Sequence, residues 1–196
     1  MRVDGQRSDA QTNRRRLIDA TEALLATQGS FTLTDLATEA GVSRATTYRN
    51  FASPNDAVTA FISEFLSEFE DAISDEGSVV ANIEEVCLAW GDLVERRSSA
   101  LVKVRSTEGF LARTRSGDSI ICRIDALVRA AILLDDHGST LSQSDLDYAV
   151  FLWNLLLDPR ELLDLGEHCE ANVRAATLRM SAEFMACLRR IPGQES

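Results

Sequence analysis

The chain has 196 residues, only three of them proline, and its formal net charge is −11. This length suits one large domain, or a small domain followed by a larger one, and it allows a substantial core. The acidic total argues against a general binder of polyanions. The lack of any run of roughly 18 apolar residues argues against a membrane-spanning helix. No alternating strand pattern stands out, so the expected fold class is all-α.

Cysteine usage and the first residues point to a cytoplasmic protein. The four cysteines are widely spaced and form no CxxC motif, so we expect them to be reduced and partly buried. They are Cys87, Cys122, Cys169 and Cys187. The first ten residues, MRVDGQRSDA, are too polar for a secretory signal.

The N-terminal segment is expected to be disordered over residues 1–12 and helical from about Asn13 to Gln28. The buried stripe of this helix recurs at helical spacing. Its members are Leu17, Ile18, Thr21, Leu24 and Leu25. Three arginines, residues 14–16, stand at the start of the helix, where cations oppose the helix dipole. Such a cluster is either a solvated charge run or the contact of a phosphate partner.

Residues 31–51, FTLTDLATEAGVSRATTYRNF, have the pattern of two short helices joined by a tight turn. Thr32 and Asp35 have the spacing of a capping box, and apolar residues then recur at helical spacing. Gly41 ends the first helix, because glycine enters the left-handed conformation without steric cost. Ser43 caps the second helix. The whole stretch therefore predicts a helix-turn-helix.

A helical wheel divides the second helix into two faces. Thr47 and Phe51 fall on the side of a core. The opposite side carries a methyl, a guanidinium, a hydroxyl and a phenol, from Ala45, Arg49, Thr46 and Tyr48. This set suits a DNA major groove, because arginine reads guanine, a methyl meets thymine, and hydroxyls reach bases or phosphates. The alternative is an ordinary solvated surface helix.

Charge is distributed unevenly along the chain. Residues 1–60 contain seven arginines and seven acidic residues, so the other 136 residues carry the whole net charge of −11. A neutral head in front of an acidic body favours one docking face. DNA affinity would then depend on a few placed arginines.

A further helix starts at Ser53, Pro54 and Asp56, which have N-terminal capping spacing. Its apolar face extends to about Ile73, too far for a three-helix head alone, so we interpret it as a connector. The expected organisation is a tail over 1–12, a helix-turn-helix domain over 13–53, a connector over 54–73 and a body over 74–196.

The helix pattern RRRLIDATEALLATQG, the stretch LTDLATEAGVSRATTYRNF and the immediate start of a new helix occur together in residues 14–66. Tyr48 and Phe51 form an aromatic pair after the turn. With these features the segment resembles the DNA-binding domain of the TetR family of bacterial transcriptional regulators. The resemblance covers about the first third of the chain. It implies an N-terminal three-helix helix-turn-helix domain plus a C-terminal helical ligand-binding and dimerisation domain.

The resemblance implies that the second helix of the motif enters the major groove, while Thr32 and Tyr48 reach phosphates. Together with the arginines, the predicted DNA-binding residues are Arg14, Arg15, Thr32, Ser43, Arg44, Ala45, Thr46, Tyr48, Arg49 and Asn50. The sequence departs from the family at Thr47, where leucine is common. It also departs at Pro54, where a lysine usually meets the DNA backbone. Arg49 or the arginines at 14–16 would compensate for that lysine.

The body is expected to contain five helices, at about 79–98, 101–115, 118–135, 142–157 and 158–190. In the last helix apolar residues alternate steps of four and three, the spacing of helices packed side by side. This seam is either core or a dimer interface, and the resemblance favours a four-helix dimer bundle. A dimer also fits the reading of two half-sites about 34–36 Å apart. The predicted interface residues are Val173, Thr177, Met180, Phe184 and Cys187.

Large apolar residues on three body helices, with two charged neighbours, form a candidate pocket for a small apolar effector. They are Trp90, Arg105, Glu108, Phe110, Phe151 and Trp153. An ordinary packed core is the alternative. The resemblance supports the pocket, since such regulators commonly bind an apolar effector between these helices. An acyl or lactone-like compound is our expectation.

No catalytic constellation, glycine-rich phosphate loop or metal-ligand spacing stands out, so no enzyme activity, metal or cofactor is expected. The sequence predicts a homodimeric transcriptional repressor that binds a palindromic operator in double-stranded DNA and is released by a small apolar effector. Two alternatives are kept. One is a helical interaction module whose head does not read DNA, and the other is a helical-bundle enzyme that uses acidic residues of the body.

Overall fold

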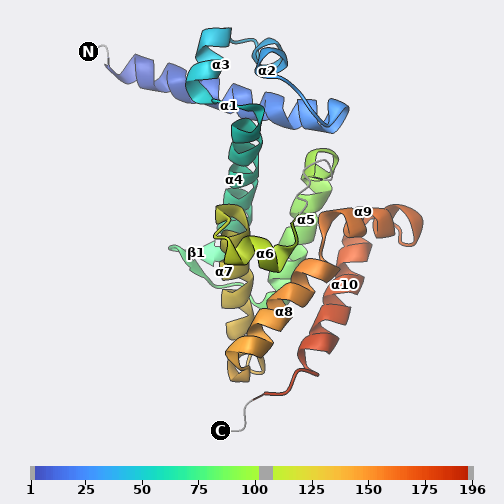
Figure 1. Ribbon diagram of the computed structural model, residues 1–196. Coiled ribbons are helices and arrows are strands. Elements are labelled where there is room, and N and C mark those ends of the chain that lie inside the picture. The colour runs from blue at the N-terminus through green and yellow to red at the C-terminus, as the bar shows by residue number, and fades with distance from the viewer. Residues whose placement is uncertain (1–2, 102–107, 194–196) are drawn as a thin grey trace. The chain divides into compact units, whose positions relative to one another are not determined.

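The computed structural model describes residues 3–101 and 108–193. Helices dominate it, with a short two-stranded hairpin between α4 (Pro54–Ile73) and α5 (Ile83–Leu101) (Figure 1). The predicted all-α class is confirmed. Within the described residues, no helix is long and apolar enough to cross a membrane. The chain divides into two compact units: a head, formed by the described residues up to Phe65 with the end of α5, and a body, formed by the remainder.

The head contains α1 (Val3–Gln28), α2 (Leu33–Glu39), α3 (Arg44–Asn50) and the first part of α4. Leu17 of α1 and Leu36 of α2 are completely buried in its core, and Phe51 follows α3 into the same core. Both α2 and α3 pack on α1 and on each other. The short α3 is therefore held in place by tertiary packing, which a helix of seven residues needs because it is too short to be stable alone.

The helix α1 begins at Val3, ten residues before the predicted start at Asn13. The expectation of disorder over residues 1–12 is therefore wrong for residues 3–12. This segment contains no proline, and glutamine, arginine and alanine favour helix even where no core is available. Residues 9–12 are largely exposed, so the apolar stripe that suggested a later start marks where α1 meets the core.

The connector α4 spans Pro54–Ile73, as the sequence predicts. Ser53 and Asp56 form a reciprocal cap at its start: the Asp56 N–H donates to Ser53 Oγ at 3.2 Å, and the Ser53 N–H donates to the Asp56 carboxylate at 3.0 Å. The boundary between the two units falls inside this helix, since residues up to Phe65 pack with the head and those from Leu66 with the body. A single helix thus belongs to both units.

The body begins with the end of α4 and the hairpin, and helices form most of the rest of its described residues. Its elements are β1 (Ser74–Asp75), β2 (Ser78–Val79), α5, α6 (Phe110–Arg115), α7 (Ser119–Leu133), the 3₁₀ turn η1 (Gly138–Thr140), α8 (Gln143–Leu156), α9 (Pro159–His168) and α10 (Val173–Leu188). The strands are antiparallel, with Ser74 opposite Val79, and the turn places Glu76 and Gly77 at positive φ.

The sequence prediction of one long final helix from 158 to 190 is wrong, because the chain breaks it into α9 and α10. The Asn172 side chain accepts the Ala175 N–H at 2.9 Å and so caps a new helix. Gly166 permits the close return, since a Cβ at that position would lie 2.8 Å from the Val173 nitrogen. Polar capping and a glycine contact together override the continuous helical periodicity.

Candidate nucleic-acid interface

The first helix of the helix-turn-helix is fixed by a complete capping box at Thr32 and Asp35. The Asp35 N–H donates to Thr32 Oγ1 at 3.2 Å, and the Thr32 N–H donates to the Asp35 carboxylate at 2.8 Å. The backbone hydrogen bond from Thr32, followed by the bond from its hydroxyl, lowers the pKa of Asp35. The predicted box is confirmed, and Thr32 is exposed.

The turn between α2 and α3 is set by Gly41 and Ser43. Gly41 has φ +61°, and a Cβ there would lie 2.9 Å from a guanidinium nitrogen of Arg16. Ser43 Oγ accepts the Thr46 N–H at 3.1 Å and lies 2.9 Å from the Thr46 hydroxyl. The turn and the cap therefore fix where α3 begins, and packing on α1 and α2 holds the rest of it.

The two faces of α3 differ as the helical wheel predicts. Thr47 is completely buried, with its hydroxyl 3.3 Å from the Ser43 carbonyl that accepts its hydrogen bond. Tyr48 is 58% exposed, although a tyrosine of this size would gain from burial. Exposed residues of the predicted DNA-contacting set include Ser43, Arg44, Ala45 and Arg49, while Thr46 and Asn50 are half-buried. A DNA major groove admits one α-helix, so a single groove would accommodate this face.

Neighbouring arginines at the start of the core-facing part of α1 have different partners. The Arg14 guanidinium lies over the Phe51 ring at 5.4 Å from its centre. Arg15 instead pairs with Asp19 at 3.1 Å and with Glu64 of α4. Arg14 therefore faces the end of α3, whereas Arg15 is engaged within the head. No local pattern in the sequence pointed to Glu64, because its partner is 49 residues away.

A groove of about 550 Å³ opens where α1, α3 and α4 meet. Arg14, Tyr48, Arg49 and Asn50 line it from the first two helices. The Asn50 amide donates to the Thr46 carbonyl at 2.8 Å, so this side chain is held along its own helix. Four residues of the predicted DNA-binding set therefore share one concave surface.

In the body, the structure brings together two of the six predicted effector-binding residues. The rings of Trp90 and Trp153 lie 5.4 Å apart, and Phe69 of α4 meets Trp90 edge-on at 5.2 Å. The Trp90 Nε1–H donates to the Leu157 carbonyl at 2.8 Å. The sequence did not place Phe69 in this aromatic cluster, because in sequence it is one of many apolar residues along α4. Near this cluster in sequence, burial raises the pKa of the Cys87 thiol to about 11, so that thiol stays neutral.

The remaining predicted effector residues differ in how deeply they are buried. Phe110 is buried at the start of α6, Phe151 is half-buried on α8, and Glu108 is exposed. Arg105 lies outside the described residues. The aromatic cluster is therefore the best-defined part of the predicted effector site, and the site itself stays a prediction.

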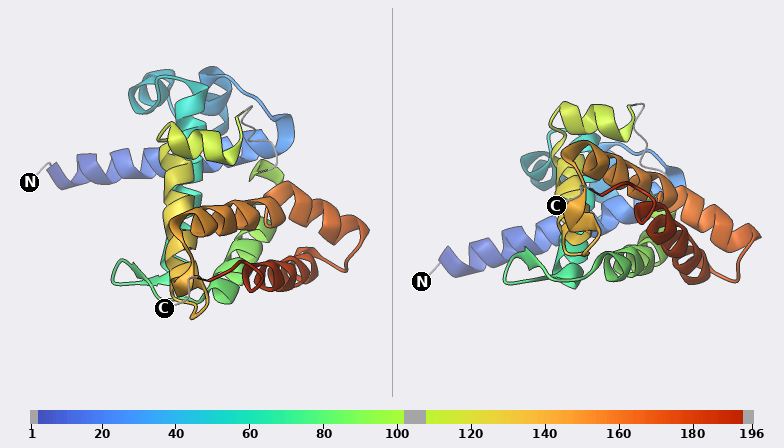
Figure 2. Two further views of the ribbon diagram at one scale, coloured as in Figure 1. Left: turned by 60° about the horizontal axis from the view of Figure 1, so that its bottom comes forward. Right: turned by 90° about the horizontal axis from the view of Figure 1, so that it is seen from below.

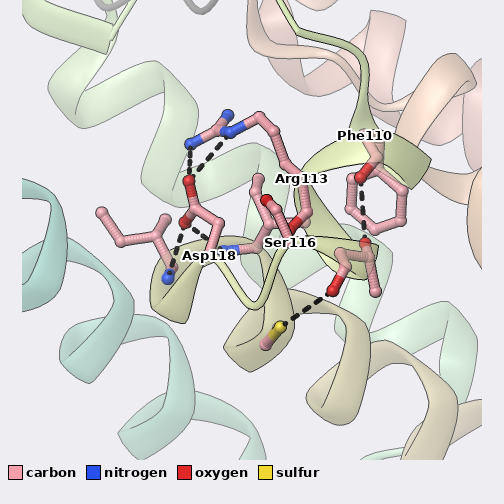
Figure 3. A network of polar contacts seen from close by, with 8 residues as sticks. Phe110, Arg113, Ser116 and Asp118 are labelled. Carbon is pink, nitrogen blue, oxygen red and sulfur yellow. Dashed lines mark hydrogen bonds and ion pairs between the residues drawn. The ribbon is translucent and has the colours of Figure 1, made fainter.

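The corner between α6 and α7 is tied together by Asp118 (Figure 3). Its carboxylate accepts the N–H groups of Ile120 and Ile121 at 3.0 and 3.2 Å and pairs with Arg113 at 2.9 Å. Burial alone would raise the pKa of Asp118, but the backbone hydrogen bonds and the Arg113 guanidinium outweigh it and lower that pKa. A charged, fully bonded cap thus holds α6 to α7.

The seam of α10 requires a correction. Val173, Thr177 and Phe184, predicted at a dimer interface, are buried inside a single chain. Thr177 packs on Gly91 of α5, where a Cβ would lie 2.2 Å from the threonine hydroxyl. The seam spacing therefore records packing within the body at these three positions. Met180 and Cys187 are half-buried and keep their predicted role as a proposal.

An apolar surface lies where α8 and α10 run side by side, as both views of Figure 2 show. Tyr148 and Leu155 of α8 are more than half exposed, and Leu152 lies between them on the same helical stripe. A groove of about 340 Å³ joins Tyr148 and Leu152 to Cys187 of α10. We call the surface formed by Tyr148, Leu152, Leu155, Met180 and Cys187 the α8–α10 face.

In residues 3–101 and 108–193, no group of three or more His, Cys, Asp or Glu side chains is arranged to hold a metal ion. The four cysteines are free thiols. Cys87 is buried, Cys122 and Cys187 are half-buried, and Cys169 is exposed.

Comparison with known proteins finds similarity at the level of the fold. No model of a known protein family and no curated protein matches the chain. Among solved structures, the chain is similar to SmeT in its complex with triclosan, with a TM-score of 0.60 and 13% sequence identity over 89% of this chain and 90% of that one. An identity this low shows a shared fold alone, and that fold is all-α.

Proposed function

We propose that the protein is a transcriptional regulator of the TetR family that binds a palindromic DNA operator as a homodimer and is released by a small apolar effector. The observation that carries this proposal is the outward face of α3. It is fixed by Ser43 and Gly41 at the turn and exposes Arg44, Ala45 and Arg49. Side chains that are both pre-oriented and exposed are what direct reading of base edges requires.

The α8–α10 face is the proposed dimer interface. A single α3 of seven residues reads too few base pairs for specificity, whereas a two-fold dimer reads two half-sites. Within this face Tyr148 and Leu155 are exposed in one chain and the other three residues are half-buried, and a two-fold interface uses the same patch on both subunits. Burial of Tyr148, Leu152 and Leu155 against a second copy would remove this surface from water.

The effector is proposed to bind in the body near Phe69, Trp90 and Trp153. The three rings are buried, pack on one another and carry no charge, which favours an apolar compound. The structure similar in fold, SmeT, is a complex with triclosan. Release from DNA follows if effector and DNA favour different states, because each ligand then lowers the affinity for the other, typically by about 1–3 kcal/mol.

Selection of bound sequences from random duplex DNA tests the proposal. We expect the purified protein to recover a palindrome, and Tyr48→Phe and Arg49→Ala to weaken binding to it in a titration while the oligomeric state is unchanged. Arg189→Ala, which removes an exposed arginine of the body, serves as the matched control. Recovery of no sequence above background, with and without effector candidates, would instead favour a head that is an interaction module.

A further inference from the structure

The groove at the meeting point of α1, α3 and α4 has the chemistry of an anion site. Two guanidinium groups, from Arg14 and Arg49, and the phenol of Tyr48 line it. The carboxylate in its lining is Asp56, which accepts the N–H groups of Ala52 and Ser53 at 3.0 Å each. That carboxylate also caps α4, and two guanidinium groups against one carboxylate leave the lining with a net positive formal charge.

The two neighbouring arginines of α1 are prepared for different tasks. Arg14 lies over the Phe51 ring, and this cation–π contact restrains its position while the N–H groups at the guanidinium edge stay available. Arg15 is paired with Asp19 and Glu64. Within the part of the chain that the structure describes, neither Arg14 nor Arg49 forms an ion pair. A free, pre-placed guanidinium is suited to two parallel hydrogen bonds with a phosphate.

We propose that this groove seats one backbone phosphate of duplex DNA between Arg14 and Arg49, with the Tyr48 hydroxyl as a third donor. Arg15 is then a positioning residue that ties α1 to α4 through Glu64 and makes no DNA contact. The assignment rests on the proposed function. It gives different roles to Arg14 and Arg15, both of which were expected from the sequence to bind DNA.

The location of the groove identifies duplex DNA as its occupant. Tyr48 lies both in the groove lining and on the exposed side of α3, so a phosphate held there belongs to the strand that α3 approaches. Pro54, the first residue of α4, has neither a charge nor an N–H to offer a phosphate. The groove beside it supplies the missing positive charge from α1 and α3.

The salt dependence of binding to a duplex of about 20 base pairs and arbitrary sequence tests the seat, because phosphate contacts carry no sequence information. The slope of log affinity against log salt is negative, and removal of one phosphate-binding cation makes it shallower by about one. We expect Arg14→Ala and Arg49→Ala each to make this negative slope shallower by about one and to weaken binding several-fold. We expect Arg15→Ala to leave the slope unchanged and to lower the thermal midpoint of the protein. Arg14→Lys should keep most of the slope.

The outcomes separate the seat from the wider proposal. An unchanged slope in Arg14→Ala and Arg49→Ala, with binding by the parent protein intact, overturns the seat. A shallower slope in Arg15→Ala with an unchanged thermal midpoint overturns the assignment of phosphate binding to Arg14 and of positioning to Arg15. A wild-type protein that binds no duplex at low salt overturns both the seat and the proposed function. Arginine-dependent binding without any selected palindrome keeps the seat and rejects sequence reading.

Discussion

The helices α3 and α10 each carry residues that the sequence marks as functional, α3 in the head and α10 in the body. Most of these residues are exposed on α3, whereas most of them are buried on α10. In α3, Tyr48 and Arg49 point away from the core, and Thr47 alone is buried. In α10, Val173 and Phe184 fill the core of their own unit. The same helical periodicity thus marks a free surface in one case and an internal contact in the other.

Polar composition, and not periodicity, distinguishes the two helices. A short helix with one buried side leaves most of its polar residues exposed, and those residues have few structural tasks. An apolar seam satisfies any neighbour of matching shape, whether that neighbour is in the same chain or in another. Function is therefore easier to infer from α3 than from α10.

The largest effect is expected from Trp153→Ala, which tests whether the aromatic cluster is structural. Trp153 is 1% exposed, and truncation of a buried tryptophan costs about 3–5 kcal/mol of unfolding free energy. Trp90 is the other tryptophan of the chain, so its fluorescence reports unfolding of the body in a denaturant titration. The outward face of α3 should be unaffected, and binding of duplex DNA at low temperature should persist.

Trp153→Phe is the matched control. Within the described residues Trp153 Nε1 has no hydrogen bond of normal geometry and only a weak side-chain contact with the Cys87 thiol, so phenylalanine removes a poorly satisfied donor while keeping an aromatic ring. Its loss of stability should be well below that of alanine. Equal losses of unfolding free energy in Trp153→Ala and Trp153→Phe would mean that the retained ring contributes nothing to packing. The contrast between an exposed α3 and a tightly packed body would then be rejected.

Much of the head could be predicted from the sequence, because its signals are local. The box at Thr32 and Asp35, the turn at Gly41 and the cap at Ser43 each involve residues within a few positions, and all are present. The bounds of α4 were also predicted, since Pro54 marks its start. Local capping chemistry is readable from a single sequence.

Features that depend on distant contacts could not be predicted. The pairing of Arg15 with Glu64 joins residues 49 positions apart, and the approach of Gly91 to Thr177 joins α5 to α10. The break between α9 and α10 was missed although Asn172 is a good capping residue, because the apolar pattern continues on both sides of it. The DNA and effector residues, and Met180 and Cys187 at the proposed dimer interface, stay predictions because each depends on a partner.

A smaller effect is expected from Leu155→Glu, which tests the α8–α10 face as a dimer interface. Leu155 is 55% exposed, so the substitution should leave the fold intact, but a carboxylate buried against a second copy is costly. We expect the dimer dissociation constant to rise roughly tenfold or more, which corresponds to at least about 1.4 kcal/mol. Sedimentation velocity over a concentration series measures it.

Leu178→Glu provides the matched control on α10. Leu178 is 48% exposed and lies nine residues from Cys187, which places it on the opposite side of that helix. This variant should dimerise like the parent protein. Dissociation caused by Leu178→Glu and not by Leu155→Glu would assign the interface to the other side of α10.

The smallest effect is expected from Asp118→Ala, which removes a capping side chain of the body. Loss of an N-cap side chain costs about 0.5–2 kcal/mol of unfolding free energy. Arg113→Ala, which keeps the cap and removes only the ion pair, should cost about 1 kcal/mol or less. Denaturant titrations of the two variants and the parent protein measure both losses.

The pH dependence of the Asp118→Ala loss tests whether the charge of the cap matters. The folded-state pKa of Asp118 is lowered, so its contribution is present above the unfolded pKa of about 4 and is lost as the pH falls through the folded pKa. The stability difference between the parent protein and Asp118→Ala should therefore be constant from about pH 5 to 7 and should shrink below about pH 4. A difference that persists at low pH would mean that the neutral carboxyl caps α7 equally well, and that the Arg113 charge has no part in holding the α6–α7 corner.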